Sequence, residues 1–108
     1  QDFGRRRTVF APFMGVPAAT LNMTSRLAER TGAAVLPVQS LRLPDGTWEV
    51  RIEPALSDFP SGDDVADATK VNAVIERHVR AAPEQYFWVH RRFKTRPDPA
   101  EPSPYQAL

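Results

Sequence analysis

One stretch near the end of the chain decides how the rest of the sequence is interpreted: Pro83-Glu84-Gln85-Tyr86-Phe87-Trp88-Val89-His90-Arg91-Arg92-Phe93-Lys94-Thr95-Arg96-Pro97. The consecutive aromatic residues at its centre favour burial, because clustered aromatic side chains usually bury a large area. The basic residues that follow need water or an anion. We therefore predict a short turn of helix over residues 84–88, packed in the core, followed by an extended basic segment at a charged rim.

The residues before this stretch predict a long helix that ends at Pro83. Ser61-Gly62-Asp63-Asp64 supplies the N-cap candidates. Acidic residues in the first turn and basic residues in the last turn both suit the helix dipole. One face of the helix is apolar at helical spacing, through Val65, Ala68, Val71, Ile75 and Val79.

Strand patterns upstream of this helix complete an α/β fold with a partial sheet of about three strands and two main helices. Residues 8–14 predict a short buried strand, and residues 33–38 form the continuous apolar run of a strand covered on both faces. Pro44-Asp45-Gly46 predicts a turn. In the strand that follows, the apolar residues alternate with charged ones and are expected to face the core: Trp48, Val50 and Ile52.

Another helix is predicted between the first two strands. Pro17 suits a first helical turn, apolar residues recur at helical spacing over residues 18–31, and Gly32 is a natural C-cap. A sheet of three strands is thin, so an isolated chain of this kind is expected to be only marginally stable.

Length and composition limit what the chain forms. Its 108 residues make one domain at most, which we assign to residues 1–96, with residues 97–108 as a proline-rich extended tail. The absence of cysteine excludes disulfides, thiolate metal sites and a cysteine nucleophile. No apolar run approaches the roughly 18 residues of a transmembrane helix and no signal peptide is visible, so this chain itself is expected neither to span a membrane nor to be exported.

Basic residues gather at both ends of the chain, although the net charge is only +1. Arg5, Arg6 and Arg7 form one cluster. The other consists of Arg77, Arg80, Arg91, Arg92, Lys94 and Arg96. If the fold brings the ends together, they make an anion site; solvated surface arginines are the plain alternative. Nucleic acid is not expected as a partner, because the net charge is near zero and no recognised binding motif is present.

Catalytic patterns are scarce. The sequence has no glycine-rich phosphate loop, no metal-spaced cluster of His, Asp and Glu, and no nucleophile elbow. His78 lies near the predicted helix end, where a structural or surface role is expected. His90 either makes a structural hydrogen bond or contacts an anionic headgroup. No catalytic residue and no metal ligand is assigned.

The basic stretch resembles the C-terminal signature of the bacterial lipid A biosynthesis acyltransferases, the late lauroyl or myristoyl transferases of the lysophospholipid acyltransferase-like superfamily. The resemblance continues through residues 9–20, residues 26–38 and the positions Pro60, Asn72, Ile75 and Glu76. Gln1-Asp2-Phe3-Gly4 looks like the remainder of an Asp-x-Asp-x-Gly block. The similarity runs from Gln1 to about Tyr105, which is nearly the whole chain.

The resemblance implies the C-terminal portion of a glycerolipid acyltransferase-like fold at the cytoplasmic face of the bacterial inner membrane. The implied reaction moves a fatty acyl chain from acyl carrier protein to a hydroxyl of a Kdo-lipid A precursor, in lipopolysaccharide biosynthesis. The implied partners are therefore acyl carrier protein, the lipid A precursor, the inner-membrane surface and the N-terminal part of the same enzyme. Acyl carrier protein serves as donor substrate, and no cofactor is implied.

The sequence departs from the family at the catalytic step. The family uses a His followed five positions later by Asp or Glu, whose carboxylate orients the imidazole that deprotonates the acceptor hydroxyl. Here the corresponding positions are Pro83 after His78 and Thr95 after His90. The chain also begins without a methionine. We therefore expect a fragment or a processed product that does not turn over alone.

The resemblance assigns substrate-binding roles to eight residues. Arg91, Arg92 and Lys94 would bind substrate phosphates or the phosphopantetheine arm, because guanidinium groups offer paired donors to phosphate oxygens. Arg5 and Arg6 would do the same from the other end of the chain. Asp2 would hold a donor or the catalytic histidine region, and Gly15 and Thr20 would line the acceptor cleft. The alternative is a noncatalytic basic module that binds an anionic membrane surface.

Overall fold

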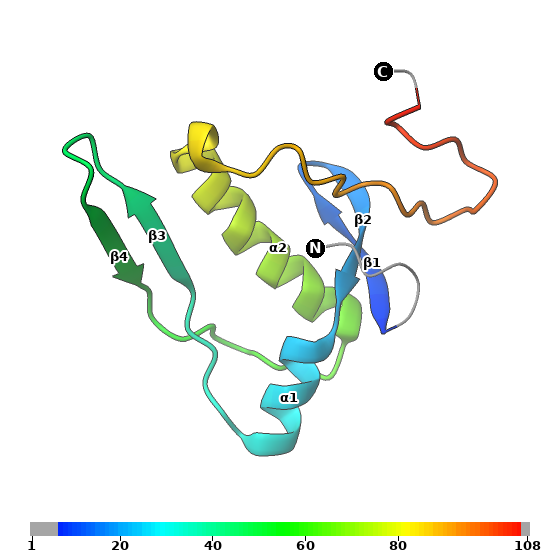
Figure 1. Cartoon of the computed structure of the whole chain (residues 1–108). Coiled ribbons are helices and arrows are strands. Elements are labelled where there is room, and N and C mark those ends of the chain that lie inside the picture. Colours follow the sequence, from blue (N-terminus) through cyan, green and yellow to red (C-terminus); the bar gives the residue numbers. More distant parts are fainter. Residues whose placement is uncertain (1–6, 107–108) are drawn as a thin grey trace.

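The computed structural model of the chain describes residues 7–106 and confirms the α/β class (Figure 1). Its strands form two separate antiparallel hairpins, not one partial sheet of three strands. The elements follow one another as β1 (Thr8–Phe13), β2 (Val16–Leu21), α1 (Met23–Thr31), β3 (Val38–Arg42), β4 (Trp48–Ile52), α2 (Asp64–Ala81) and the 3₁₀ helix η1 (Pro83–Gln85).

A two-residue turn joins β1 to β2, so that Phe13 lies opposite Val16 and Thr8 opposite Leu21. Its central residues, Met14 and Gly15, have φ angles of 51° and 76°. Positive φ at both central residues is the geometry of a type I′ turn, whose twist matches that of the flanking strands. The prediction that a helix begins at Pro17 was therefore wrong. The chain reverses at Met14 and Gly15, Pro17 lies in β2, and α1 begins only at Met23.

The α2 helix confirms the prediction from its capping residues. The Asp63 side chain accepts hydrogen bonds from the backbone N–H groups of Val65 and Ala66, at 3.0 and 3.1 Å. The helix packs on β1, where Phe13, Ala18 and Val79 form the centre of a small core. Met14, Tyr86 and Phe93 pack around this centre.

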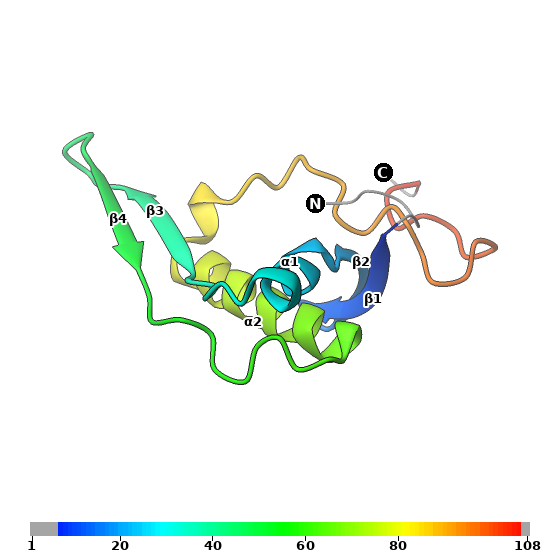
Figure 2. The same ribbon diagram turned by 90° about the horizontal axis from the view of Figure 1, so that it is seen from below.

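The β3–β4 hairpin projects from the rest of the molecule (Figure 2). The predicted turn at Pro44-Asp45-Gly46 is confirmed, but residues 33–37 form no strand, and β3 begins at Val38. The expected burial of the apolar face of β4 was wrong, because Trp48, Val50 and Ile52 are 66%, 60% and 66% exposed. Alternation shows that one face of a strand suits an apolar neighbour; it does not show which segment supplies that neighbour.

Polar contacts attach this hairpin to α2 and η1. The Gln39 side chain donates to the carbonyl of His78 at 3.1 Å, and the Gln85 side chain bonds both backbone groups of Arg42. The resulting shape is open: the radius of gyration is 15.3 Å, whereas a compact domain of this length has about 13 Å. Neither α2 nor any other helix in residues 7–106 combines the length and the apolar character that crossing a membrane requires.

Candidate functional site

A buried polar cluster joins the basic stretch to the N-terminal hairpin. Arg92 is only 6% exposed, and its guanidinium donates to the Ala19 carbonyl at 2.6 Å and to the Thr20 hydroxyl at 3.0 Å. The same guanidinium lies over the Phe13 ring, 5.4 Å from its centroid. From α2, the Asn72 amide donates to the Thr20 hydroxyl at 3.0 Å and to the Pro12 carbonyl at 3.2 Å.

The Thr20 hydroxyl is the centre of this cluster. It donates to the Ala18 carbonyl at 2.9 Å and accepts from both Asn72 and Arg92. A hydroxyl has one donor hydrogen and two acceptor lone pairs, so its hydrogen-bonding capacity is fully used. Thr20 therefore links three segments, β2, α2 and the basic stretch, through one atom. A saturated, buried hydroxyl of this kind serves primarily to hold the segments together.

Arg91 and Lys94 lie on the opposite, exposed side of the basic stretch. The Arg91 guanidinium stands 5.9 Å from the centroid of the Tyr105 ring, and the Tyr105 hydroxyl accepts from the backbone N–H of Phe93 at 3.0 Å. The proline-rich tail thus folds back against this stretch. Of the residues assigned to phosphate binding, Arg91 and Lys94 are open to solvent, whereas Arg92 is directed into the protein.

Gly15 lies in the β1–β2 turn. A Cβ atom added there would meet nothing within 4 Å, so the positive φ of the turn, and not a close approach, accounts for glycine. The N–H of its neighbour Met14 donates to the Glu76 carboxylate at 2.9 Å, which secures the turn to α2. The hydrogen bond from Arg80, and to a smaller extent the one from this N–H, hold the pKa of the Glu76 carboxyl below its usual value. The remaining assigned residues, Asp2, Arg5 and Arg6, lie outside the described residues.

A second charged cluster ties the end of β4 to α2. The Glu53 carboxylate accepts from both terminal nitrogens of Arg77, at 3.0 and 2.8 Å, and contacts Nε2 of His78 at 2.6 Å. Hydrogen bonds from the Arg77 guanidinium, the larger cause, and from the His78 ring lower the pKa of the Glu53 carboxyl from 4.5 to about 2. His78 therefore has a structural role at the helix end, as its position predicted.

The depressed pKa of Glu53 predicts an acid-sensitive attachment of the β3–β4 hairpin. A carboxyl group whose pKa is lower in the folded state stabilises the fold above its unfolded-state pKa and loses that contribution as the pH falls. We expect the melting temperature of the chain to drop between about pH 4.5 and pH 2. Glu53→Gln should flatten this part of the profile, whereas the exposed carboxylate variant Glu84→Gln should leave it unchanged. Parallel profiles for Glu53→Gln and the parent chain would contradict the prediction.

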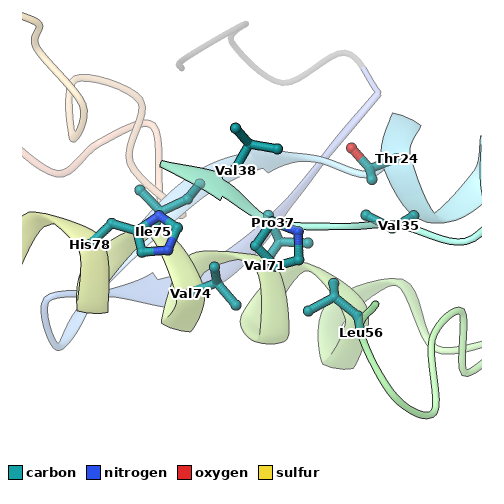
Figure 3. Close-up of a pocket in the computed structure, with 9 residues that line it drawn as sticks. All are labelled: Thr24, Val35, Pro37, Val38, Leu56, Val71, Val74, Ile75 and His78. Atoms are coloured by element: carbon teal, nitrogen blue, oxygen red, sulfur yellow. The ribbon is translucent and has the colours of Figure 1, made fainter. Parts of the chain in front are cut away.

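An apolar cavity of about 130 Å³ lies between α2 and the segment that leads into β3. Figure 3 shows Val71, Val74, Ile75 and His78 on the helix, with Val35, Pro37 and Val38 on the segment that passes beside it. Thr24 and Leu56 complete the lining near Val35, at the end away from His78. Its lining is mainly hydrocarbon, which suits an apolar group and offers little to a charged one. Within residues 7–106, no group of three or more His, Asp or Glu side chains is placed to hold a metal ion.

The aromatic residues of the basic stretch differ from the prediction. Tyr86 is half-buried against Phe13, with ring centroids 6.3 Å apart, and burial raises the pKa of its hydroxyl. Phe87 and Trp88, which were expected in the core, are 71% and 60% exposed. Tyr86 alone turns toward α2, so neighbouring aromatic residues in an irregular segment do not share one environment.

Four important residues had no assigned role at the sequence level: Asn72, Glu76, Glu53 and Tyr105. Asn72 and Glu76 do occupy positions that the family pattern expects, and this was the one available signal for them. Asn72 is 2% exposed and lies on the face of α2 that meets β1. A polar residue on an apolar helix face indicates a buried hydrogen bond, although the sequence cannot name its partner.

The chain is similar in sequence to known proteins of one family. The sequence profile of the bacterial lipid A biosynthesis acyltransferases matches residues 1–95. The lipid A biosynthesis palmitoleoyltransferase of Escherichia coli K12 is 43% identical over 99 residues, which is 90% of this chain and 32% of the relative. The lauroyltransferase of the same organism is 42% identical over 99 residues, again 90% and 32% of the two chains.

The lipid A biosynthesis myristoyltransferase of Escherichia coli K12 is 32% identical over 109 aligned positions, covering 98% of this chain and 33% of the relative. The chain thus spans about a third of the length of these curated relatives. The profile match covers most of the chain and includes the buried cluster as well as the basic stretch up to Thr95. The chain therefore belongs to the bacterial lipid A biosynthesis acyltransferase family.

Proposed function

We propose that this chain forms the C-terminal part of an acyltransferase that moves a fatty acyl chain from acyl carrier protein to a hydroxyl of a Kdo-lipid A precursor. The observation that carries the proposal is the family match over residues 1–95. The relatives are named as palmitoleoyl-, lauroyl- and myristoyltransferases of lipid A biosynthesis, so the transferred group is a fatty acyl chain in each of them.

In this proposal Arg91 and Lys94 bind the anionic part of a substrate. Both are exposed, and within residues 7–106 no carboxylate lies within ion-pairing distance of either one. Arg92, which lies between them in the sequence, holds this part of the stretch in position through its hydrogen bonds to Ala19 and Thr20. The anions these residues meet are the phosphates of the lipid A precursor or of the phosphopantetheine arm.

The chemical step requires a general base that this chain does not supply. Transfer breaks the thioester bond of the donor and forms an ester bond to the acceptor oxygen, and the hydroxyl proton ends on the released thiol. Neither His78 nor His90 is followed by an acidic residue at the fifth position. His78 is also engaged with Glu53. We therefore assign the base to the N-terminal part of the enzyme and propose that this chain alone is inactive.

The uncovered apolar surfaces support a partner of this kind. The apolar face of β4 is exposed, and an apolar cavity lies beside α2. The N-terminal part of the enzyme would cover them and extend the sheet from the hairpin. The complete enzyme would then work at the cytoplasmic face of the inner membrane, where the acyl acceptor resides.

A chimera tests the proposal. The matched third of the Escherichia coli palmitoleoyltransferase is replaced by this chain, and the purified chimera is assayed for transfer from acyl carrier protein to a Kdo-lipid A precursor. We expect transfer by the chimera and none by the chain alone. Arg91→Gln together with Lys94→Gln should raise KM at least tenfold, since each phosphate contact contributes about 1.5–3 kcal/mol.

The matched control is Arg80→Gln, which removes an exposed cation that is already paired with Glu76. It should leave KM nearly unchanged. A folded chimera that transfers no acyl chain of any length would overturn the proposal. If the chimera transferred no acyl chain while the chain alone bound anionic vesicles with steep salt dependence, the noncatalytic basic module would be the better account.

A further inference from the structure

The most exposed apolar side chains of the described residues include three neighbours in one turn after η1. Phe87, Trp88 and Val89 are 71%, 60% and 75% exposed. The N–H of His90 donates to the Phe87 carbonyl at 3.1 Å, which closes a four-residue turn with these side chains at its tip. Turn tips are normally occupied by Gly, Pro, Asn, Asp or Ser. Large apolar groups at such a place indicate a surface that is used.

This apolar tip, defined as Phe87, Trp88 and Val89, is held in place. The indole N–H of Trp88 donates to the Pro83 carbonyl at 2.6 Å, and its ring stands edge-on to Tyr86 with centroids 4.8 Å apart. The backbone N–H of Trp88 donates to the Tyr86 carbonyl at 2.9 Å. Tyr86 is packed against the core, so the exposed ring is anchored from behind. A fixed side chain loses little conformational entropy when it binds.

The charges beside the apolar tip are mostly positive. A second turn, closed by the Lys94 N–H and the Arg91 carbonyl at 3.3 Å, follows directly and carries the exposed cations Arg91 and Lys94. Glu84 on η1 is the exposed acid on the other side, next to Gln85, whose side chain bonds the backbone of the exposed Arg42. In Figure 2 this segment runs along one side of the molecule, opposite the loop between β4 and α2.

We propose that the apolar tip enters the interfacial region of an anionic lipid surface, with Arg91 and Lys94 at the level of the headgroups. Tryptophan favours the membrane–water interface, because its ring is apolar and its N–H is polar. Basic residues beside it are attracted by anionic headgroups. The inference deepens the proposed function, since it rests on the membrane location and names the surface that makes the contact.

A lipid surface fits this tip better than another protein segment does. The backbone of the turn is internally hydrogen-bonded through Trp88 and His90, so it offers no edge for a further strand. The apolar face of β4, in contrast, belongs to a two-stranded sheet whose edge strands have unpaired backbone groups. Another strand of the enzyme can pair with such an edge, so this surface fits a protein partner. Lipid requires only side-chain contact and charge complementarity, and the tip provides both.

The two tryptophans of the chain allow a direct test, since Trp48 and Trp88 are both exposed and lie on the two competing surfaces. The full chain carrying Trp48→Phe leaves Trp88 as the reporter, and Trp88→Phe leaves Trp48. Each variant is mixed with vesicles of phosphatidylcholine, with and without phosphatidylglycerol. We expect a blue shift of Trp88 emission, and quenching by lipids brominated near the headgroup, only with the anionic vesicles. Trp48 should change little.

Two serine pairs separate the surfaces independently of the tryptophans. Phe87→Ser with Val89→Ser should reduce vesicle partitioning at least tenfold, whereas Val50→Ser with Ile52→Ser, the matched exposed pair on β4, should leave it within twofold. Arg91→Gln and Lys94→Gln should each weaken it about fivefold. Circular dichroism establishes that each variant keeps its helices, and these measurements do not depend on acyl transfer.

Several outcomes would overturn the inference. Quenching of Trp48 equal to or greater than that of Trp88 would place the contact on β4. A blue shift of Trp88 that grows with protein concentration without vesicles would identify a second copy as the partner. Protection of Trp88 from hydroxyl-radical labelling in the lipid-free chimera would show that the rest of the enzyme covers it. If the chimera is active, any of these results contradicts only the lipid contact, and the proposed acyltransferase function is unaffected.

Discussion

Replacing Phe13 with alanine is expected to remove the cooperative unfolding transition of the isolated chain. Truncating a buried phenylalanine costs about 3–5 kcal/mol, because the transfer free energy is lost and a cavity remains. Phe13 is 3% exposed and contacts Tyr86 and Phe93, with ring centroids 6.3 and 6.1 Å away. It also lies beneath the guanidinium of Arg92. A domain of this length has a total stability of about 5–15 kcal/mol, and this open one should lie at the lower end.

The measurement is urea unfolding followed by far-ultraviolet circular dichroism, with the stabilising osmolyte TMAO present in both samples. Phe13→Leu, which keeps most of the buried volume, should retain the transition at a reduced midpoint. Phe10→Ala is the matched control on the same strand, because Phe10 is only half-buried. An unchanged midpoint for Phe13→Ala would show that the small core around Phe13 does not hold the chain together.

Replacing Arg92 with methionine is expected to lower the free energy of unfolding by about 2–4 kcal/mol. Methionine keeps the apolar stem, but the Ala19 carbonyl and the Thr20 hydroxyl each lose a buried donor. An unsatisfied buried polar group costs about 1–3 kcal/mol. Arg91→Met is the matched control: it removes the adjacent, exposed arginine and should change the stability by at most about 0.5 kcal/mol.

A double-mutant cycle identifies the cause. Thr20→Val removes the shared hydroxyl and leaves two donors unpaired, so its effect should be strongly coupled to that of Arg92→Met, by about 0.5–3 kcal/mol. Thr20→Ser should restore most of the lost stability. Additive effects, or equal effects of Arg91→Met and Arg92→Met, would contradict the structural role given to Arg92.

Local chemistry was sufficient to predict part of this fold. The N-cap at Asp63, the end of α2 before Pro83, the C-cap at Gly32 and the turn at Pro44-Asp45-Gly46 are all confirmed. Each depends on residues within a few positions of one another, so the sequence itself contains the cause. The same holds for the structural role of His78 at the helix end.

The features that the sequence did not predict depend on distant contacts. Residues 18–21 have a helical pattern but pair with β1, because the turn at Met14-Gly15 brings an adjacent strand within reach. The inward orientation of Arg92 depends on Ala19 and Thr20, more than seventy residues away. A row of arginines suggests a single anion-binding surface. Only the fold shows that one of them is directed inward while its neighbour is exposed.

The saturated hydroxyl of Thr20 also limits how this protein can evolve. Its side-chain partners, Asn72 and Arg92, come from two other segments, so a change at position 20, 72 or 92 leaves a buried polar group without its partner. A lineage that replaces Arg92 must pass through a poorly stable intermediate, or change positions 20 and 72 almost together. These three positions should therefore covary as one inherited unit, while the exposed cations beside them drift with the chemistry of the surface they meet.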